Sequence, residues 1–84
     1  MPTVLRVRGF QFYFFSQEGS EPAHIHVERG DGTAKYWLNP IRRQYTYNFS
    51  PREIRQIERI VTEQRDQLLE AWDGYFNQSK QEGE

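Results

Sequence analysis

The sequence predicts an α+β fold: an antiparallel sheet of four to five strands, with one long C-terminal helix packed on one face. Apolar and polar residues alternate in short runs through the first half of the 84-residue chain, as in half-buried strands. The second half carries a helix-start signal followed by apolar residues at helical spacing. We expect a single domain over residues 1–77 and a polar, disordered tail over residues 78–84.

The first hairpin is predicted from the runs 4–8 and 10–15, which Gly9 separates. Alternation gives this hairpin an apolar face and a polar face. The polar loop over residues 16–22 then leads to a second hairpin. The apolar face carries Leu5, Val7, Phe10, Phe12 and Phe14, and the polar face carries Arg6, Arg8, Gln11 and Tyr13.

The second hairpin is predicted around the Asp31-Gly32 turn, and its first strand holds both histidines of the chain. This turn would pair Val27 with Tyr36 on one face and His26 with Trp37 on the other. A slip of two residues would change the partners but keep the faces. We expect Gly30 and Gly32 to supply the positive φ angles of the turn.

Asn39-Pro40 ends the fourth strand, and residues 44–49 can add a peripheral fifth strand. The helix then starts at Ser50-Pro51, where serine suits the N-cap and proline the first helical position. Glu53 completes a capping box. The apolar stripe that follows contains Ile54, Ile57, Val61, Leu68 and Trp72.

This helix is expected to exceed the sheet in length. From Pro51 to about Asn77 it would run ~40 Å, against ~20 Å for a six-residue strand. An apolar overhang of this kind marks a dimer interface or a docking site for a partner protein. The alternative is a bend that folds the end back onto the sheet. The residues expected at the interface are Leu68, Leu69, Trp72, Tyr75 and Phe76.

Composition limits the classes of function. The chain has no cysteine, so disulfides and thiolate metal sites are excluded. Neither a signal peptide nor an apolar run of membrane-spanning length is visible, which predicts a cytoplasmic protein without a membrane partner. The net charge of −1 gives no overall field that attracts nucleic acid, so any RNA binding needs a local patch.

His24 and His26 are the residues that hint at chemistry. They lie two apart on one side of a strand, pointing away from Ile25 and Val27, and we expect them to be exposed. The plainest interpretation is that they fill polar strand positions. A metal site would need a further ligand such as Glu28, because two histidines leave a tetrahedral site half-filled. We expect no metal and no cofactor.

The third interpretation is a site for a phosphodiester. His24, His26 and Lys35 would be catalytic, and Arg6, Arg8 and Trp37 would bind the substrate. One imidazole would take the proton of a ribose 2′-hydroxyl, and the other would protonate the leaving oxygen. The cations would stabilise the developing charge. Such a protein would be a metal-independent ribonuclease.

Five blocks of the chain together resemble a known family: residues 1–6, 12–14, 22–27, 32–38 and 49–54. The family is one of small bacterial proteins labelled domain of unknown function four-one-six-zero, and the H-x-H-V and A-K-Y-W-L motifs carry the resemblance. It implies a gene beside that of another small protein and a role of the toxin–antitoxin type. We therefore expect a component that acts on RNA through the histidine-bearing face. The alternative is a non-enzymatic interaction module that binds a co-encoded partner.

Overall fold

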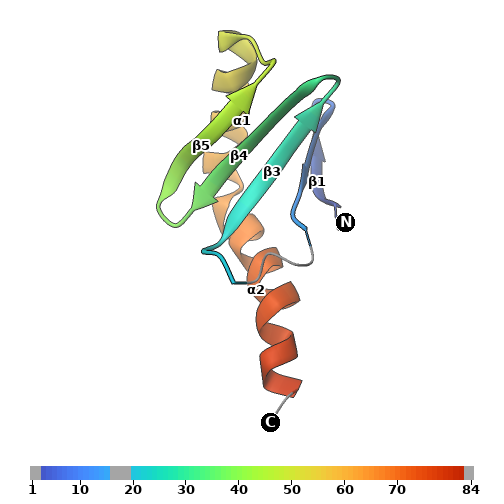
Figure 1. Ribbon diagram of the computed structural model, residues 1–84, viewed down its shortest axis with the longest axis vertical. Helices are drawn as coiled ribbons and strands as arrows, with labels where there is room; N and C mark the ends of the chain where they lie inside the picture. Colours follow the sequence, from blue (N-terminus) through green and yellow to red (C-terminus); the bar gives the residue numbers. More distant parts are fainter. Residues whose placement is uncertain (1–2, 16–19, 83–84) are drawn as a thin grey trace.

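Five antiparallel strands form one sheet in chain order, and two helices cover one of its faces (Figure 1). The computed structural model describes residues 3–15 and 20–82, with side chains described up to residue 76. The α+β prediction is confirmed, with the fifth strand present at the edge of the sheet. The strands are β1 (Thr3–Val7), β2 (Phe10–Tyr13), β3 (His24–Arg29), β4 (Gly32–Leu38) and β5 (Ile41–Tyr47).

The C-terminal half contains two helices, α1 (Pro51–Glu63) and α2 (Arg65–Glu82), so the prediction of one long helix is wrong. Gln64 separates them with φ −104° and ψ 13°. The guanidinium group of Arg65 donates to the backbone oxygen of Leu38 at 3.1 Å and to Asn39 Oδ1 at 2.9 Å. These bonds attach the start of α2 to the end of β4. They are tertiary contacts. The sequence around Gln64 has no glycine or proline that would predict the break between the two helices.

α2 continues past the end of the sheet, which makes the molecule elongated at 46 × 22 × 20 Å (Figure 1). Two residues expected in an unpartnered overhang are instead buried within the chain: Leu68 is 1% exposed and Trp72 is 6% exposed. The Trp72 ring lies 5.5 Å from that of Phe14. The helix also includes residues 78–82 of the expected tail, and residues 83–84 lie outside the described part of the chain.

The core lies between the helices and the sheet face that we call the inner face. Alternate residues of β2, β3 and β4 point into it and meet Ile57, Ile60 and Val61 of α1. Each fully buried aliphatic or aromatic side chain contributes about 1.5–3 kcal/mol to folding. The inner face is formed by Phe10, Phe12, Phe14, Ile25, Val27, Ala34, Tyr36 and Leu38.

The pairing of β3 with β4 differs by two residues from the predicted one. Ile25 pairs with Tyr36 and His26 with Lys35, so the turn residues are Gly30 and Asp31. The predicted partners are wrong, and the predicted faces are correct. Gly30 has the expected positive φ of 58°, whereas Gly32 does not.

Gly32 is needed for a different reason. A Cβ atom at this position would lie 2.3 Å from the ring of Phe49. The absence of a side chain therefore lets Phe49 pack on the start of β4, where its ring also meets that of Phe10 at 5.9 Å.

Candidate functional site

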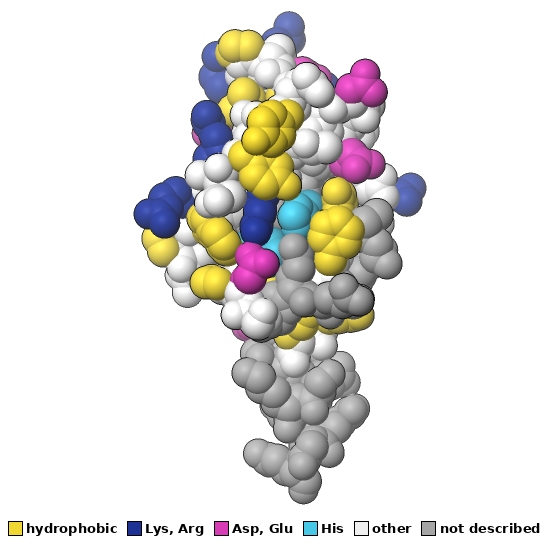
Figure 2. Space-filling model, in the orientation of Figure 1, with side chains coloured by type: hydrophobic (Ala, Val, Ile, Leu, Met, Phe, Trp, Pro, Cys, Tyr) yellow, Lys and Arg dark blue, Asp and Glu magenta, His cyan; other side chains and the backbone are white. Residues whose placement is uncertain are grey.

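The second face of the sheet, which we call the outer face, lies opposite the helices and carries the residues of the candidate site. Four of its side chains form one row across neighbouring strands, because Tyr13 pairs with His26, His26 with Lys35, and Lys35 with Tyr45. Figure 2 shows a histidine and a cation at the centre of this face, with hydrophobic side chains around them. The outer-face residues discussed below are Tyr13, His24, His26, Lys35, Trp37, Arg42, Tyr45 and Tyr47, and the carboxylates of Glu21 and Glu28 lie on this face as well.

A β-bulge in β5 decides which residues reach this face. Lys35 pairs with Tyr45 and Tyr36 with Arg43, so Gln44 has no opposite residue on β4. The extra residue shifts the alternation, as bulges do. Arg42, Tyr45 and Tyr47 consequently share the outer face, although a regular strand would put Arg42 opposite to the two tyrosines.

His24 and His26 point away from the inner face, as expected, but they are not exposed. Their exposed fractions are 0% and 6%, so that part of the prediction is wrong. The ring of His26 stacks on Tyr13 with centroids 5.4 Å apart, and it meets the ring of Phe15 in a T-shaped arrangement with centroids 4.9 Å apart. The histidines are covered by aromatic side chains that alternation alone does not place.

His24 lies at the start of β3, where α2 passes the end of the sheet. Its ring lies 4.8 Å from that of Trp72 and 5.6 Å from that of Trp37. Its Nδ1 atom lies 2.9 Å from the backbone oxygen of Pro22. A carbonyl oxygen only accepts, so Nδ1 carries the proton and donates. The ring thus connects the sheet to α2.

Lys35 shares the face of His26 as predicted, but it pairs with His26 and not with the predicted Glu28. Its charge is already compensated. Its Nζ atom donates to Glu21 Oε1 at 2.9 Å and lies 4.7 Å above the ring of Trp37. The side chain is only 13% exposed. Lys35 therefore holds Glu21 and Trp37 in place on the outer face.

The two N-terminal arginines, Arg6 and Arg8, belong to the first hairpin and lie away from the histidines. Arg6 of the edge strand β1 pairs with Gln11 of β2, which places Arg6 on the outer face. The strand β2 lies between Arg6 and the histidines. Arg8 lies in the turn with φ 54° and borders a hollow formed with Gln56 and Arg59 of α1. The structure does not bring Arg8 to the histidines.

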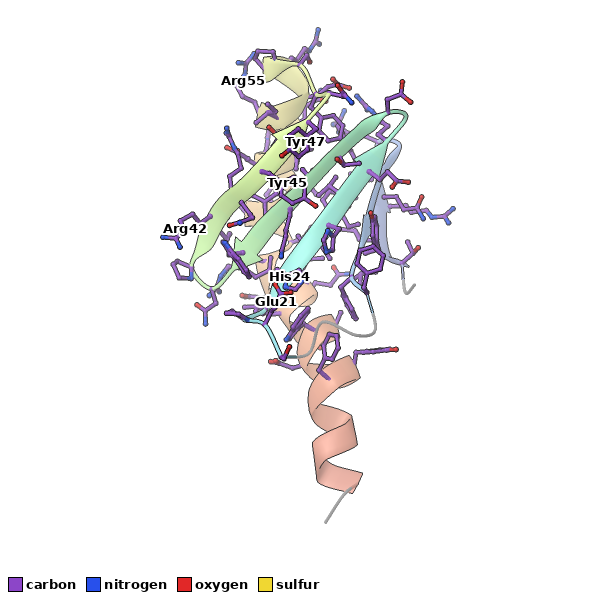
Figure 3. The ribbon with its side chains drawn as sticks, viewed as in Figure 1. Glu21, His24, Arg42, Tyr45, Tyr47 and Arg55 are labelled. Atoms are coloured by element: carbon purple, nitrogen blue, oxygen red, sulfur yellow. The ribbon has the colours of Figure 1, made fainter. Side chains whose placement is uncertain are left out.

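Three residues of the outer face were missed from the sequence: Arg42, Tyr45 and Tyr47. Tyr47 is 62% exposed, and its ring lies 5.2 Å from that of Tyr45. Figure 3 shows both tyrosines along β5 and Arg42 nearer the β4–β5 turn. The Tyr-Thr-Tyr repeat in the expected fifth strand was the available signal, since alternate residues of a strand share a face.

The described part of the chain contains both histidines and Glu28, the residues of the metal-site interpretation. Within it, no group of three or more His, Asp or Glu side chains is arranged to hold a metal ion. Glu28, the expected third ligand, accepts a hydrogen bond from the Tyr13 hydroxyl at 3.4 Å. Neither helix in the described ranges is long and apolar enough to cross a membrane.

Fold and site together define a small α+β protein whose sheet has one face packed by helices and one aromatic face without them. The family model described as "Domain of unknown function (DUF4160)" matches residues 9–73, and the chain belongs to this family. No curated protein and no solved structure matches it.

Proposed function

We propose that the protein binds single-stranded RNA on the outer face of its sheet, as one component of a toxin–antitoxin-type pair. The neighbouring rings of Tyr45 and Tyr47 support this most directly, because single-stranded RNA is recognised by stacking of its bases on aromatic side chains. Arg42 is exposed on the same side of β5 and can contact a phosphate.

Stacking needs an accessible ring, and β5 provides one at the edge of the sheet. Tyr47 is the most exposed of the large hydrophobic residues in the described part of the chain. Tyr45 lies next to it and pairs with Lys35, at the β5 end of the row that includes His26. A strand of RNA lying along β5 would meet the two tyrosines in succession and then Arg42.

The burial of the histidines favours binding over cleavage. A general acid or base must come within about 2.6–3.2 Å of the proton that it transfers. His24 and His26 are packed against Tyr13, Phe15, Trp37 and Trp72, which leaves little of either imidazole open to a ribose on the surface. In this proposal they support the aromatic side chains of the outer face.

Substitution of the tyrosines tests the proposal. Binding of a fluorescein-labelled, ten-nucleotide single-stranded RNA is measured by anisotropy. Tyr45→Ala and Tyr47→Ala are each expected to weaken binding by about 5-fold to 100-fold, since a stacked base contributes about 1–3 kcal/mol. Tyr45→Phe and Tyr47→Phe keep the ring and should bind like the wild type. Alanine variants that bind as tightly as the phenylalanine variants would overturn the proposal.

The same RNA, recovered after incubation, separates binding from cleavage. We expect it to remain intact with the wild-type protein. Cleavage that disappears in His26→Ala, while that variant keeps the circular dichroism spectrum of the wild type, would instead establish the ribonuclease interpretation.

A second candidate function is binding of a co-encoded protein or of a second copy through α2. Its support is Tyr75, which is 43% exposed beside the partly buried Phe76. Sedimentation velocity of the wild type and of Tyr75→Asp tests the second copy: self-association that the substitution abolishes would support it. A monomer at all concentrations would exclude self-association through α2.

A further inference from the structure

A cavity of about 360 Å³ lies on the outer face, at the end of the sheet where β4 turns into β5. Trp37 forms an aromatic wall, and Pro22 and Pro40 add apolar walls. Asn39, Arg42 and Gln44 supply its polar groups. Gln44 is the bulge residue of β5, so the irregularity that brings the tyrosines to this face also brings an amide to the cavity.

The orientation of both amides follows from their partners. Trp37 Nε1 donates to Gln44 Oε1 at 2.8 Å, and the Arg65 guanidinium donates to Asn39 Oδ1 at 2.9 Å. An indole N–H and a guanidinium can only donate, so each amide oxygen must face its partner. The NH2 groups of Asn39 and Gln44 are therefore turned away from these partners and remain as donors for a ligand.

The guanidinium of Arg42 adds further donors and a positive charge. No carboxylate is among the described residues that line the cavity. A ligand that fits must consequently offer acceptors to every polar wall, a flat body to the indole and prolines, and a negative charge to Arg42.

We propose that this cavity binds one uridine nucleotide of the RNA, with the two carbonyl oxygens of uracil accepting from the amides and the phosphate contacting Arg42. This inference rests on the proposed function and adds base selectivity to it. Uracil presents a carbonyl where cytosine presents an amino group, and an amino group would face the donors of Asn39 and Gln44. The volume lies at the low end of the ~300–1,000 Å³ typical of small-molecule sites, which suits one pyrimidine nucleotide.

Titration with single nucleotides tests the selectivity without the rest of the RNA. The indole N–H signal of Trp37 in a 15N-correlated NMR spectrum reports on the cavity, because Trp37 donates to Gln44 there. Uridine monophosphate should shift this signal with an affinity about tenfold higher than cytidine monophosphate. The matching experiment on the whole face compares eight-nucleotide oligo(U) with oligo(C) by anisotropy, with the same preference expected.

Gln44→Glu provides the decisive variant. The carboxylate still accepts from Trp37 Nε1 and replaces the NH2 donor with a second acceptor, so the preference should reverse to cytidine. Its matched control is Gln56→Glu, which makes the same change of charge on α1 and should keep the preference for uridine.

Failure of the inference and failure of the proposed function give different results. If oligonucleotides bind through Tyr45 and Tyr47 while uridine and cytidine monophosphates bind equally or not at all, the inference is wrong and the proposed function stands. If Gln44→Glu keeps the uridine preference, the assignment of the donors is wrong. If neither oligonucleotide nor nucleotide binds, both proposals are wrong.

Discussion

Gly32 shows how a single position can determine the junction between the sheet and α1, because it leaves room for the ring of Phe49. Phe49 precedes the N-cap residue Ser50, and its ring covers the start of β4 where a side chain on Gly32 would lie. The ring reaches Phe10 on β2 as well. The entry of the chain into α1 thus depends on the absence of a side chain at Gly32, because the Phe49 ring occupies that space.

Gly32→Ala is expected to destabilise the protein by about 1–3 kcal/mol, because the added methyl group would lie within 2.3 Å of the Phe49 ring and force it to move. Urea denaturation monitored by circular dichroism measures the free energy of unfolding. The double variant Gly32→Ala/Phe49→Ala removes the clash, so its loss should be clearly smaller than the sum of the two single losses. Additive losses would show that the contact is not the cause.

The N-terminus of α1 is held by its capping box and by an arginine of β3. The backbone N–H of Ser50 donates to Glu53 Oε1 at 2.8 Å, and the Ser50 hydroxyl accepts from the Glu53 backbone at 3.1 Å, which is the predicted capping box. Arg29 at the end of β3 donates to the other oxygen of Glu53 at 2.6 Å. The hydrogen bond from Ser50 and then that from Arg29 lower the pKa of Glu53.

This lowered pKa predicts how the contribution of Glu53 depends on pH. A carboxyl group with a lower pKa in the folded state stabilises the fold above its unfolded pKa of about 4.3 and loses that effect as the pH falls through the folded value. The free energy of unfolding at pH 7 should therefore be higher for the wild type than for Glu53→Gln. This difference should shrink below about pH 4.3. Chemical denaturation from pH 7 to pH 3 measures it.

The matched control for this pH series is Glu70→Gln, an exposed position on α2. Its difference from the wild type should change little over the same range. A difference for Glu53→Gln that stays constant down to pH 3 would mean that the carboxylate charge is not what stabilises the start of α1.

A second contact between α1 and the sheet uses a buried phenol. The Tyr36 hydroxyl donates to Glu58 Oε2 at 2.8 Å, and Arg43 of β5 donates to the same oxygen. Burial, followed by the neighbouring Glu58 carboxylate, raises the pKa of Tyr36 far above its usual value. The phenol therefore stays protonated and keeps α1 attached to β4 across the pH range in which proteins are studied.

Local signals predicted the elements whose cause is local. Ser50, Pro51 and Glu53 specify the start of α1, and alternation assigned Ile25 and His26 to opposite faces. The break at Gln64 depends on the bonds of Arg65 to the end of β4, and the bulge at Gln44 depends on how β5 pairs with β4. Both are tertiary effects, so a sequence pattern does not reveal them, and the outer-face residues that follow from the bulge were missed with it.

The histidines illustrate the same limit at the candidate site. Alternation correctly directed His24 and His26 away from the inner face and placed Lys35 on the same face, although the predicted pairing of Lys35 was wrong. Alternation does not report whether Tyr13, Phe15 and Trp72 will close over a face. The burial of the imidazoles, on which our proposal of binding rather than catalysis rests, became visible only from the packing of three elements.

Across the whole molecule, the proposed function assigns different roles to the two faces of one sheet. The inner face and the helices form the core, and the outer face carries the exposed side chains of Tyr47 and Arg42 together with the carboxylates of Glu21 and Glu28. The net charge is −1, so attraction of RNA cannot come from the molecule as a whole. It has to come from the placement of individual cations such as Arg42, and this placement can be tested.

The salt dependence of RNA binding tests that placement by comparing Arg42→Ala with Arg55→Ala. Both remove one exposed positive charge: Arg42 lies on β5, and Arg55 lies near the start of α1, past the end of β5 (Figure 3). Each phosphate contact contributes about 0.7 to the slope of log K against log salt for a single strand. Arg42→Ala should reduce the magnitude of this slope by about that amount, and Arg55→Ala should leave it unchanged. Equal slopes for the two variants would mean that RNA does not select the outer face, because then only the total charge, and not its position, would govern binding.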